Sequence, residues 1–318
     1  MSLSKEEFEP CGVLPLVKPV GMTSHDAVNR IRRLYGLKRV GHTGTLDPDA
    51  SGLLVILVGR AAKAAEYITV ADKTYRAVLR LGVTTDTGDA SGRVLSRCEA
   101  LPGEDAVLAA LTRFQGEIMQ VPPMYSALKR NGQKLVDLAR KGIEVEREAR
   151  PVTIYALRGS RLSDSDYALE VRCSKGTYIR TLCEDIGQAL GCGGMMAALE
   201  RTSSGSFSLS DACTLEQLES MSGEARLARL KPVEELFDDC PTVTLGDFFA
   251  RLARSGCEIY QKKLGCAYPA GKRVKMADAE GFFALGEIGE YPDGSAIKAL
   301  KLFRLAERQN GIMEKQDG

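Results

Sequence analysis

The chain contains no tryptophan, only two histidines and no apolar run longer than six residues. A helix that crosses a bilayer needs about 20 apolar residues, so no membrane-spanning segment is expected. Two histidines without clustered cysteines supply too few ligands for a zinc site, and no metal is expected. The first residues carry acidic side chains in place of the apolar core of a signal peptide, so a secretory signal is not expected either.

The nine cysteines are scattered, and no two of them form a C-x-x-C pair. An odd, dispersed set in a chain of 318 residues is typical of reduced thiols, which predicts a cytoplasmic protein. The formal net charge is only +1, so any basic face that binds nucleic acid must be local. With 44% hydrophobic residues, the chain has enough apolar material for one large domain and a smaller one.

Three common catalytic signatures are also absent. No G-x-x-x-x-G-K-[ST] phosphate-binding loop occurs, and the glycine cluster GCGGMM lacks the spacing of a dinucleotide-binding fingerprint. No G-x-S-x-G element presents a nucleophilic serine. No cofactor is therefore expected, and the candidates that remain are Asp47 on a glycine-rich loop, Tyr75 at the start of a strand and Arg180 at the start of a helix.

The loop at residues 41–54 (GHTGTLDPDASGLL) is the most distinctive stretch of the sequence. Pro48 disfavours helical angles at Asp47, and the neighbouring Thr, Ser and Asp side chains can hydrogen-bond their own backbone. An acid held on a stiff loop directly before a buried strand is well placed for catalysis. The alternative interpretation is an ordinary polar turn.

Two local stretches are basic. The first lies between Ala27 and Gly44, where no acidic residue occurs, and the second, at residues 124–150, has seven basic residues against four acids. Each could be a solvated face or a surface that binds phosphates. The basic residues are Arg30, Arg32, Arg33, Lys38 and Arg39 in the first stretch, and Lys129, Arg130, Lys134, Arg140, Lys141, Arg147 and Arg150 in the second.

Sequence patterns predict an α+β fold with a mixed, largely antiparallel sheet flanked by helices. Thr23 and Asp26 form a capping box that begins a helix, and Gly36 ends it. Arg180 lies in the first turn of a helix, where the helix dipole disfavours a cation, so an anionic partner is expected. Residues 232–241 are expected to be a linker, and residues 242–303 a small β-rich domain.

Six segments together resemble bacterial tRNA pseudouridine synthases of the TruB family, in the family's order and at its spacing. The resemblance covers nearly the whole chain. The segments are KPVGMTS (18–24), GHTGTLDPDASGLL (41–54), DKTYRAVLRLGVTTDTGDASG (72–92), VPPMYSALKRNGQKLVDLARKGIEVEREARPV (121–152), GTYIRTLCEDIG (176–187) and MMAALERTSSGSF (195–207).

The resemblance implies a catalytic domain at residues 1–235 with an RNA-binding thumb at 124–150. A PUA-like RNA-binding domain would follow at 241–306, and a tail at 307–318. The implied substrate is the T-stem-loop of tRNA, whose uridine 55 is isomerised, with no membrane, metal or obligate protein partner. The implied RNA-binding residues are Arg30, Arg33, Lys38, Arg39, Lys129, Arg130, Arg140 and Arg147.

The resemblance also implies roles for individual residues of the site. Asp47 would be the catalytic aspartate, Arg180 would pair with it, and Tyr75 would stack on the target base. Further substrate-binding residues would be Lys18 in the first motif, Tyr178 and Leu199 around the uracil, and His42, which would take the place of the flipped uridine. One departure is visible: Glu200-Arg201-Thr202 stands where an Arg-Arg pair is expected, which removes positive charge near the RNA.

Pseudouridine formation breaks the N1–C1′ bond and joins C5 of the uracil to C1′. A carboxylate could attack C1′ or remove a proton from the sugar, and the sequence leaves both routes open. Either requires ionised Asp47, which burial opposes and a bidentate pair with Arg180 would favour. Two other interpretations remain: an N-glycosylase that cuts the same bond with water, and a chaperone that refolds tRNA without catalysis.

Overall fold

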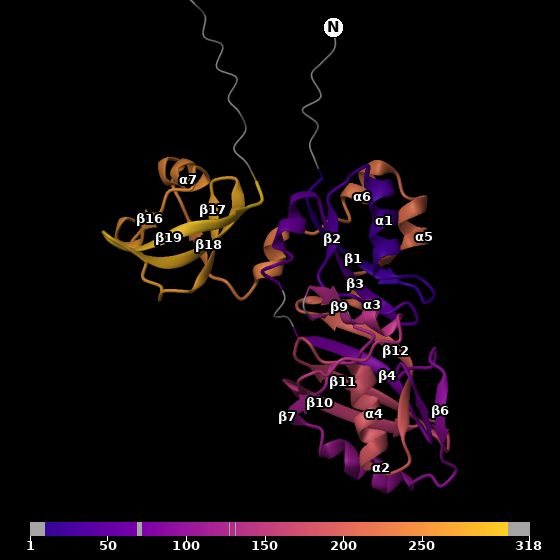
Figure 1. Ribbon diagram of the computed structural model, residues 1–318. Coiled ribbons are helices and arrows are strands. Elements are labelled where there is room, and N and C mark those ends of the chain that lie inside the picture. The colour runs from indigo at the N-terminus through magenta and orange to yellow at the C-terminus, as the bar shows by residue number, and fades with distance from the viewer. Residues whose placement is uncertain (1–9, 69–71, 127, 131, 305–318) are drawn as a thin grey trace, which may run out of the picture.

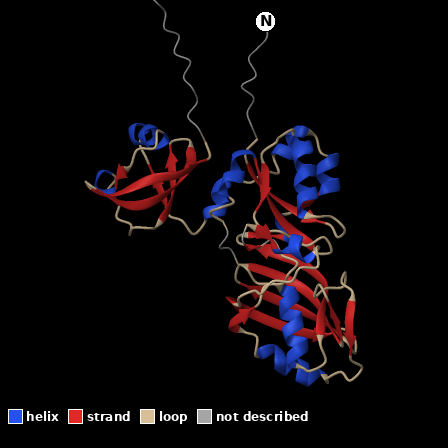
Figure 2. Cartoon of the chain, in the orientation of Figure 1, coloured by secondary structure: helices blue, strands red, loops and turns tan. Residues whose placement is uncertain are grey.

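The computed structural model describes residues 10–68, 72–126, 128–130 and 132–304. The expected tail at 307–318 and the last two residues of the expected C-terminal domain lie outside this part of the chain. Two β-sheets organise the described residues, a large one with helices against it and a smaller one near the C-terminus (Figure 1). Figure 2 shows that the helices lie around the large sheet in two separate groups.

The large sheet has ten strands in the order β14-β1-β3-β12-β4-β11-β10-β7, with β2 paired to β3 and β13 to β12. Most neighbours are antiparallel, whereas β12 pairs with β3 and β1 with β14 in parallel. The α+β prediction with a largely antiparallel mixed sheet is therefore confirmed. The strands are β1 (Gly12–Lys18), β2 (Val40–His42), β3 (Ser51–Val58), β4 (Lys73–Leu81), β7 (Gly116–Gln120), β10 (Arg150–Arg161), β11 (Asp166–Cys173), β12 (Gly194–Ser204), β13 (Phe207–Ser208) and β14 (Cys213–Thr214).

Helices cover the sheet over two apolar cores. One core lies between β4, β10, β11 and the helices α2 and α4, and the other between β1, β3 and the helices α1 and α5. Alternate residues of β4 are buried, because one face of the strand packs against α4. The helices are α1 (Ser24–Tyr35), α2 (Glu104–Thr112), α3 (Leu135–Ala139), α4 (Ile179–Ala189), α5 (Leu215–Ser220), α6 (Gly223–Leu227) and α7 (Asp247–Arg254).

The predicted start and end of α1 are confirmed. Thr23 accepts a hydrogen bond from the backbone N–H of Asp26, and the Asp26 carboxylate accepts one from the backbone N–H of Thr23. Gly36 ends the helix with φ of 65°, an angle that a side chain disfavours. Local capping rules therefore fix the helix that leads to the loop of Asp47.

The thumb, residues 124–150, consists of a short hairpin and one helical turn. Strands β8 (Lys129–Arg130) and β9 (Gln133–Lys134) pair, and α3 follows directly. A second hairpin pairs β5 (Val83–Thr85) with β6 (Val94–Arg97). Leu135 of α3 is buried, so the thumb has a small apolar anchor of its own.

The C-terminal sheet has five strands in the order β15-β17-β18-β19-β16 and one helix, α7. The expectation of a linker at 232–241 is wrong, because this segment forms a 3-10 helix, Val233–Phe237, that packs against the C-terminal sheet. The Phe237 ring lies 5.8 Å from that of Phe303. The strands are β15 (Thr242–Thr244), β16 (Ile259–Tyr260), β17 (Arg273–Asp278), β18 (Gly281–Tyr291) and β19 (Gly294–Leu302).

No helix in the described part of the chain is long and apolar enough to cross a membrane. No disulfide joins any of the nine cysteines, all of which lie within the described residues.

Candidate active site

The loop between β2 and β3 carries Asp47, and a buried lysine fixes one side of it. Lys18 is 0% exposed, and its ammonium donates to the carbonyl oxygens of Pro19 (2.8 Å), Met22 (2.6 Å) and Pro48 (3.2 Å). Burial lowers the pKa of Lys18 to about 8, although Asp47 and Asp49 attract its charge. The structure thus places the predicted Lys18 under the loop, where it holds the backbone.

Ser24 at the start of α1 fixes the same loop from a second direction. Its hydroxyl donates to the Leu46 carbonyl (2.9 Å) and accepts from the Leu46 N–H (2.8 Å), so both backbone groups before Asp47 are bound. The α1 N-terminus and the loop therefore form one rigid unit.

Arg201 of β12 fixes the far side of the loop, and sequence reasoning missed this role. Its side chain is buried; Nε donates to the Leu53 carbonyl (2.8 Å) and Nη2 to the Gly44 carbonyl (3.0 Å). Gly52 has φ of 103°, and a Cβ there would lie 2.4 Å from the Arg201 carbonyl oxygen. Only glycine permits β3 and β12 to approach so closely, and the approach brings Arg201 under the loop.

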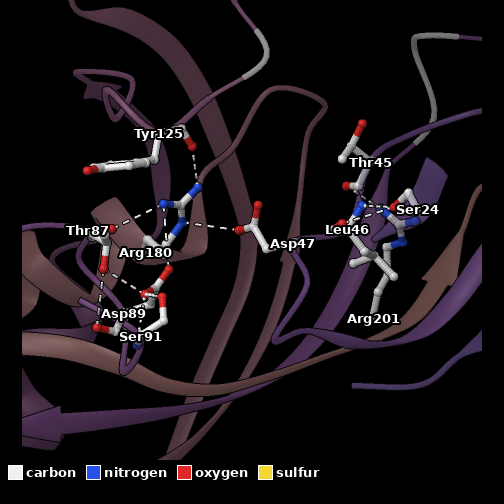
Figure 3. A network of polar contacts seen from close by, with 10 residues as sticks. All are labelled: Ser24, Thr45, Leu46, Asp47, Thr87, Asp89, Ser91, Tyr125, Arg180 and Arg201. Atoms are coloured by element: carbon white, nitrogen blue, oxygen red, sulfur yellow. Dashed lines mark hydrogen bonds and ion pairs between the residues drawn. The ribbon is translucent and has the colours of Figure 1, made fainter. Parts of the chain in front are cut away.

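Asp47 and Arg180 form an ion pair, as predicted. The Arg180 Nε lies 3.2 Å from Oδ2 of Asp47, and Figure 3 shows the two side chains pointing toward each other. The Arg180 side chain is 6% exposed, whereas that of Asp47 is 39% exposed. The carboxylate therefore keeps an open side from which a substrate can approach.

The pair is not bidentate, which corrects the expectation of a two-bond pair. Nη1 of Arg180 donates to the Thr87 carbonyl (3.1 Å), and Nη2 donates to the Tyr125 carbonyl (2.7 Å), so only Nε faces Asp47. Packing around the buried guanidinium, rather than its fork geometry, decides which nitrogen faces Asp47.

Asp89 is a second carboxylate beside Arg180, and sequence reasoning missed it. Its Oδ2 lies 3.6 Å from Nη1 of Arg180, while its Oδ1 accepts from the Thr87 hydroxyl (2.7 Å) and the Ser91 hydroxyl (2.6 Å). Figure 3 shows Thr87, Asp89 and Ser91 grouped behind the guanidinium. The Thr-x-Asp-x-Ser spacing at residues 87–91 is the sequence signal for this network.

Burial raises the pKa of Asp47, and this is the largest effect on the group. Arg180 and Lys18 oppose the rise, whereas Asp89 and Asp49 add to it. Because burial outweighs the arginine, the carboxylate ionises at a higher pH than an exposed aspartate. A base of this kind is stronger than an ordinary carboxylate.

The predicted substrate residues lie around this pair in different environments. Tyr75 is 7% exposed and packs in the core below α4, and burial raises its pKa. Tyr178 is half-buried directly before α4. His42 is half-buried, its Nδ1 has no hydrogen-bond partner among the described residues, and burial lowers its pKa, which favours a neutral ring.

Leu199 has a position that the prediction did not anticipate. It packs against both apolar cores and lines a hollow of about 490 Å³ together with Asp49 and Glu200, and Asp47 is not part of that lining. Glu200, the departure from the expected Arg-Arg pair, lies 3.7 Å from the Arg76 guanidinium, and both side chains are well exposed. It therefore makes a surface ion pair across neighbouring strands.

Some of the predicted RNA-binding residues form ion pairs within the protein, and others have exposed side chains. Arg30 pairs with Glu219 of α5, an acid that the sequence does not place near it. Arg147 donates to the Pro122 carbonyl (3.1 Å) and pairs with Glu144. Arg30 is exposed despite its ion pair with Glu219, as are Arg33, Lys38, Arg39, Arg130 and Arg140, and Lys129 lies in β8.

Comparisons with known proteins show which family the chain belongs to. The family model of the TruB family pseudouridylate synthase N-terminal domain matches residues 32–179, and that of the tRNA pseudouridylate synthase B C-terminal domain matches residues 180–238. A tRNA pseudouridine synthase B from Burkholderia pseudomallei (strain 668) is 50% identical over 271 residues, which cover 85% of this chain and 90% of that protein. The chain belongs to the TruB family.

Other TruB relatives and solved structures support the same assignment. A tRNA pseudouridine synthase B from Dechloromonas aromatica (strain RCB) is 46% identical, covering 93% of this chain and 96% of that protein. A chain in the crystal structure of a Cbf5–Nop10–Gar1 complex is 26% identical with a TM-score of 0.71, covering 92% of this chain and 85% of that one. As a TruB-family member, the protein is a tRNA pseudouridine synthase, an isomerase with an RNA substrate.

Proposed function

We propose that this TruB-family enzyme isomerises uridine 55 in the T-loop of tRNA, with Asp47 as the catalytic residue. The observation that supports this most is the pair of Asp47, which is open on one side, and Arg180, which is buried. In one route Asp47 attacks C1′ as the N1–C1′ bond breaks, and C5 of the turned uracil later displaces the carboxylate from C1′. In the other route Asp47 removes a sugar proton as that bond breaks and returns it when C5 joins C1′. In both routes N1 takes up a proton and the proton on C5 is released.

Arg180 keeps the Asp47 carboxylate charged and oriented. Its Nη atoms are bound to the carbonyls of Thr87 and Tyr125, so the guanidinium cannot rotate to follow a moving carboxylate. Such preorganisation stabilises developing charge without rearrangement at the moment of reaction. Loss of Arg180 removes the cation beside Asp47, whereas loss of Asp47 leaves the buried guanidinium with Asp89 as its remaining carboxylate.

Base flipping accompanies this chemistry, because the target base is stacked inside a folded loop. Extrusion costs a few kcal/mol, and stacking on an aromatic side chain such as Tyr75 returns roughly 1–3 kcal/mol. Tyr178 and Leu199 would contact the uracil. His42, with a neutral ring at neutral pH, would fill the gap that the flipped uridine leaves.

The proposed domain organisation follows the two sheets. Residues 1–235 form the catalytic domain, with residues 124–150 as the thumb, and residues 241–306 form a PUA-like RNA-binding domain. Contacts between the described parts of the two units support a joint RNA surface, since Arg273 lies over the Tyr67 ring and Lys301 pairs with Glu66.

The test is incubation of the full chain with an unmodified T-stem-loop RNA, followed by mapping of pseudouridine. We expect mass-neutral conversion at position 55 alone, and release of tritium from 5-tritiated uridine. An RNA with cytidine at that position is the control and releases none. Free uracil in the supernatant would instead identify an N-glycosylase, and binding without any product would favour the chaperone.

Charge reversal in the thumb, Lys129→Glu with Arg130→Glu, is expected to weaken tRNA binding by about ten- to a hundredfold at physiological salt, since two cations that neutralise phosphates are lost. The rate of conversion of bound RNA should stay the same. The measurement is Kd by filter binding over a range of salt, together with single-turnover rates at saturating enzyme.

The matched control for the thumb variant is Arg97→Glu with Arg113→Glu. It changes the net charge equally, and both residues are exposed and lie outside the thumb and the basic stretch around α1. We expect a much smaller change in Kd for this pair. Equal weakening by both double variants would show that only the overall charge matters.

A further inference from the structure

Residues 120–126, which run from the last residue of β7 into the first residues of the thumb, are bound directly to the start of α4. We call this segment the thumb root. Gln120, its first residue, is 2% exposed and spans both backbone groups of Tyr178: its Nε2 donates to the Tyr178 carbonyl (3.2 Å), and its Oε1 accepts from the Tyr178 N–H (3.1 Å). One amide side chain thus satisfies both backbone groups of the residue two positions before Arg180.

The first turn of α4 depends on this contact. Tyr178 is the N-cap residue of α4, and its own side chain makes no capping hydrogen bond. A helix N-terminus without a side-chain cap frays unless other groups hold its backbone. Gln120 instead satisfies, from β7, the backbone N–H of Tyr178 itself, which has no partner inside the helix, and so fixes the backbone of the N-cap residue.

The thumb root also reaches Arg180 itself. The Tyr125 carbonyl accepts the 2.7 Å hydrogen bond from Nη2 of Arg180, and Figure 3 shows Tyr125 beside the guanidinium on the side away from Asp89. The next residue, Ser126, is buried, and its carbonyl accepts from the N–H of Val136 in α3. A continuous set of contacts consequently runs from the thumb helix through the thumb root to Arg180.

We propose that Gln120 is a positioning residue that couples the thumb to the Asp47–Arg180 pair. Its amide fixes the start of α4, and with it the direction in which the Arg180 side chain leaves the backbone. The thumb root then holds the guanidinium so that Nε faces Asp47. This inference rests on the proposed function, because it assumes that Asp47 and Arg180 carry out the chemistry.

If Gln120 only stabilises the fold, its loss should lower stability without a specific loss of rate. Gln261, near the C-terminus, is a matched control, because its side-chain amide also binds both backbone groups of a tyrosine. Gln261 is 5% exposed, its Nε2 donates to the Tyr268 carbonyl (3.0 Å), and its Oε1 accepts from the Tyr268 N–H (2.7 Å). Methionine matches glutamine in length and volume but removes both hydrogen bonds to the tyrosine backbone at either site. At Gln261 it also removes the hydrogen bond that Nε2 donates to the Ser295 hydroxyl (2.7 Å).

The experiment compares Gln120→Met and Gln261→Met in the full chain with a 5-tritiated T-stem-loop RNA. For Gln120→Met we expect a single-turnover rate lower by about ten- to thirtyfold, while Kd changes by less than about threefold. For Gln261→Met we expect an unchanged rate and a comparable loss of thermal stability. If Gln120→Met does not fold, Gln120→Glu replaces it, since an ionised carboxylate cannot donate to the Tyr178 carbonyl.

The pH profile and a double variant test whether Gln120 acts through Arg180. The charged groups that face Asp47 are Arg180, Asp89, Asp49 and Lys18. If Gln120→Met weakens the contact between Arg180 and Asp47, Arg180 opposes the effect of burial less, and the pKa of Asp47 rises. The acid side of the pH–rate profile then moves to higher pH. In the Arg180→Met background, Gln120→Met should cause no further loss of rate.

Two outcomes would overturn the inference. The first is a Gln120→Met enzyme with the normal rate and pH profile. The second is an equal loss of rate in Gln261→Met, or losses that multiply in the double variant. Both are distinguishable from failure of the proposed function, which would appear as undiminished turnover in Asp47→Asn.

Discussion

Asp47→Asn is expected to lower pseudouridine formation at least about a thousandfold, because an amide neither attacks C1′ nor accepts a sugar proton. The substitution keeps the shape of the side chain, and Lys18, Ser24 and Arg201 hold the loop through its backbone and not through the carboxylate. Binding of tRNA should therefore stay within about twofold. Tritium release at saturating enzyme measures the rate, and filter binding measures Kd.

The matched control is Asp49→Asn, two residues further along the same loop. Asp49 is exposed and affects Asp47 only by repulsion, which raises the pKa of Asp47. Its removal should leave the rate within a few-fold of the wild type and move the acid side of the profile slightly to lower pH. Turnover that survives in Asp47→Asn, or is lost equally in Asp49→Asn, would contradict the catalytic assignment.

Arg180→Met is expected to lower the rate by about a hundred- to a thousandfold, since it removes a buried counterion that two carboxylates share. Asp47 and Asp89 would then face each other without the guanidinium between them. Because attraction to Arg180 opposes the effect of burial, its loss raises the pKa of Asp47 further. The ionised form would then be lost at a higher pH, so the acid side of the pH–rate profile should shift upward.

Arg180→Lys separates charge from geometry. An ammonium restores a positive charge, but it cannot donate to Thr87, Tyr125 and Asp47 in the same plane as the guanidinium does. We expect a smaller shift of the profile than in Arg180→Met, together with a rate still well below that of the wild type. Full activity in Arg180→Lys would show that only charge matters, and an unshifted profile in Arg180→Met would show that the pair does not set the pKa of Asp47.

Interactions between near neighbours and the order of the motifs allowed several features of this protein to be predicted from the sequence. The capping box at Thr23, the glycine end at Gly36 and the alternation in β4 depend on near neighbours, so they were predictable. The order of the motifs indicated the TruB family, which the comparisons confirm. The same motifs pointed to Asp47 and Arg180 as a pair.

Other features could not be predicted from the sequence, because long-range packing decides them. The segment 232–241 has the composition of a linker, yet the C-terminal sheet buries Phe237. Arg30 lies in a stretch without acids, but Glu219 comes to it from α5. Neither contact has a local signal, since the two partners are far apart in the chain.

The sequence by itself therefore determined the fold class, the family and the identity of the acid at the centre of the site. Only the tertiary structure decided that one nitrogen of Arg180 faces Asp47, that Arg201 holds the loop from below and that Gln120 holds the start of α4. Each of these three side chains is buried, so its donors and acceptors must bind the backbone groups that lie close to it in the folded protein. That choice depends on how strands and helices from distant parts of the chain pack together.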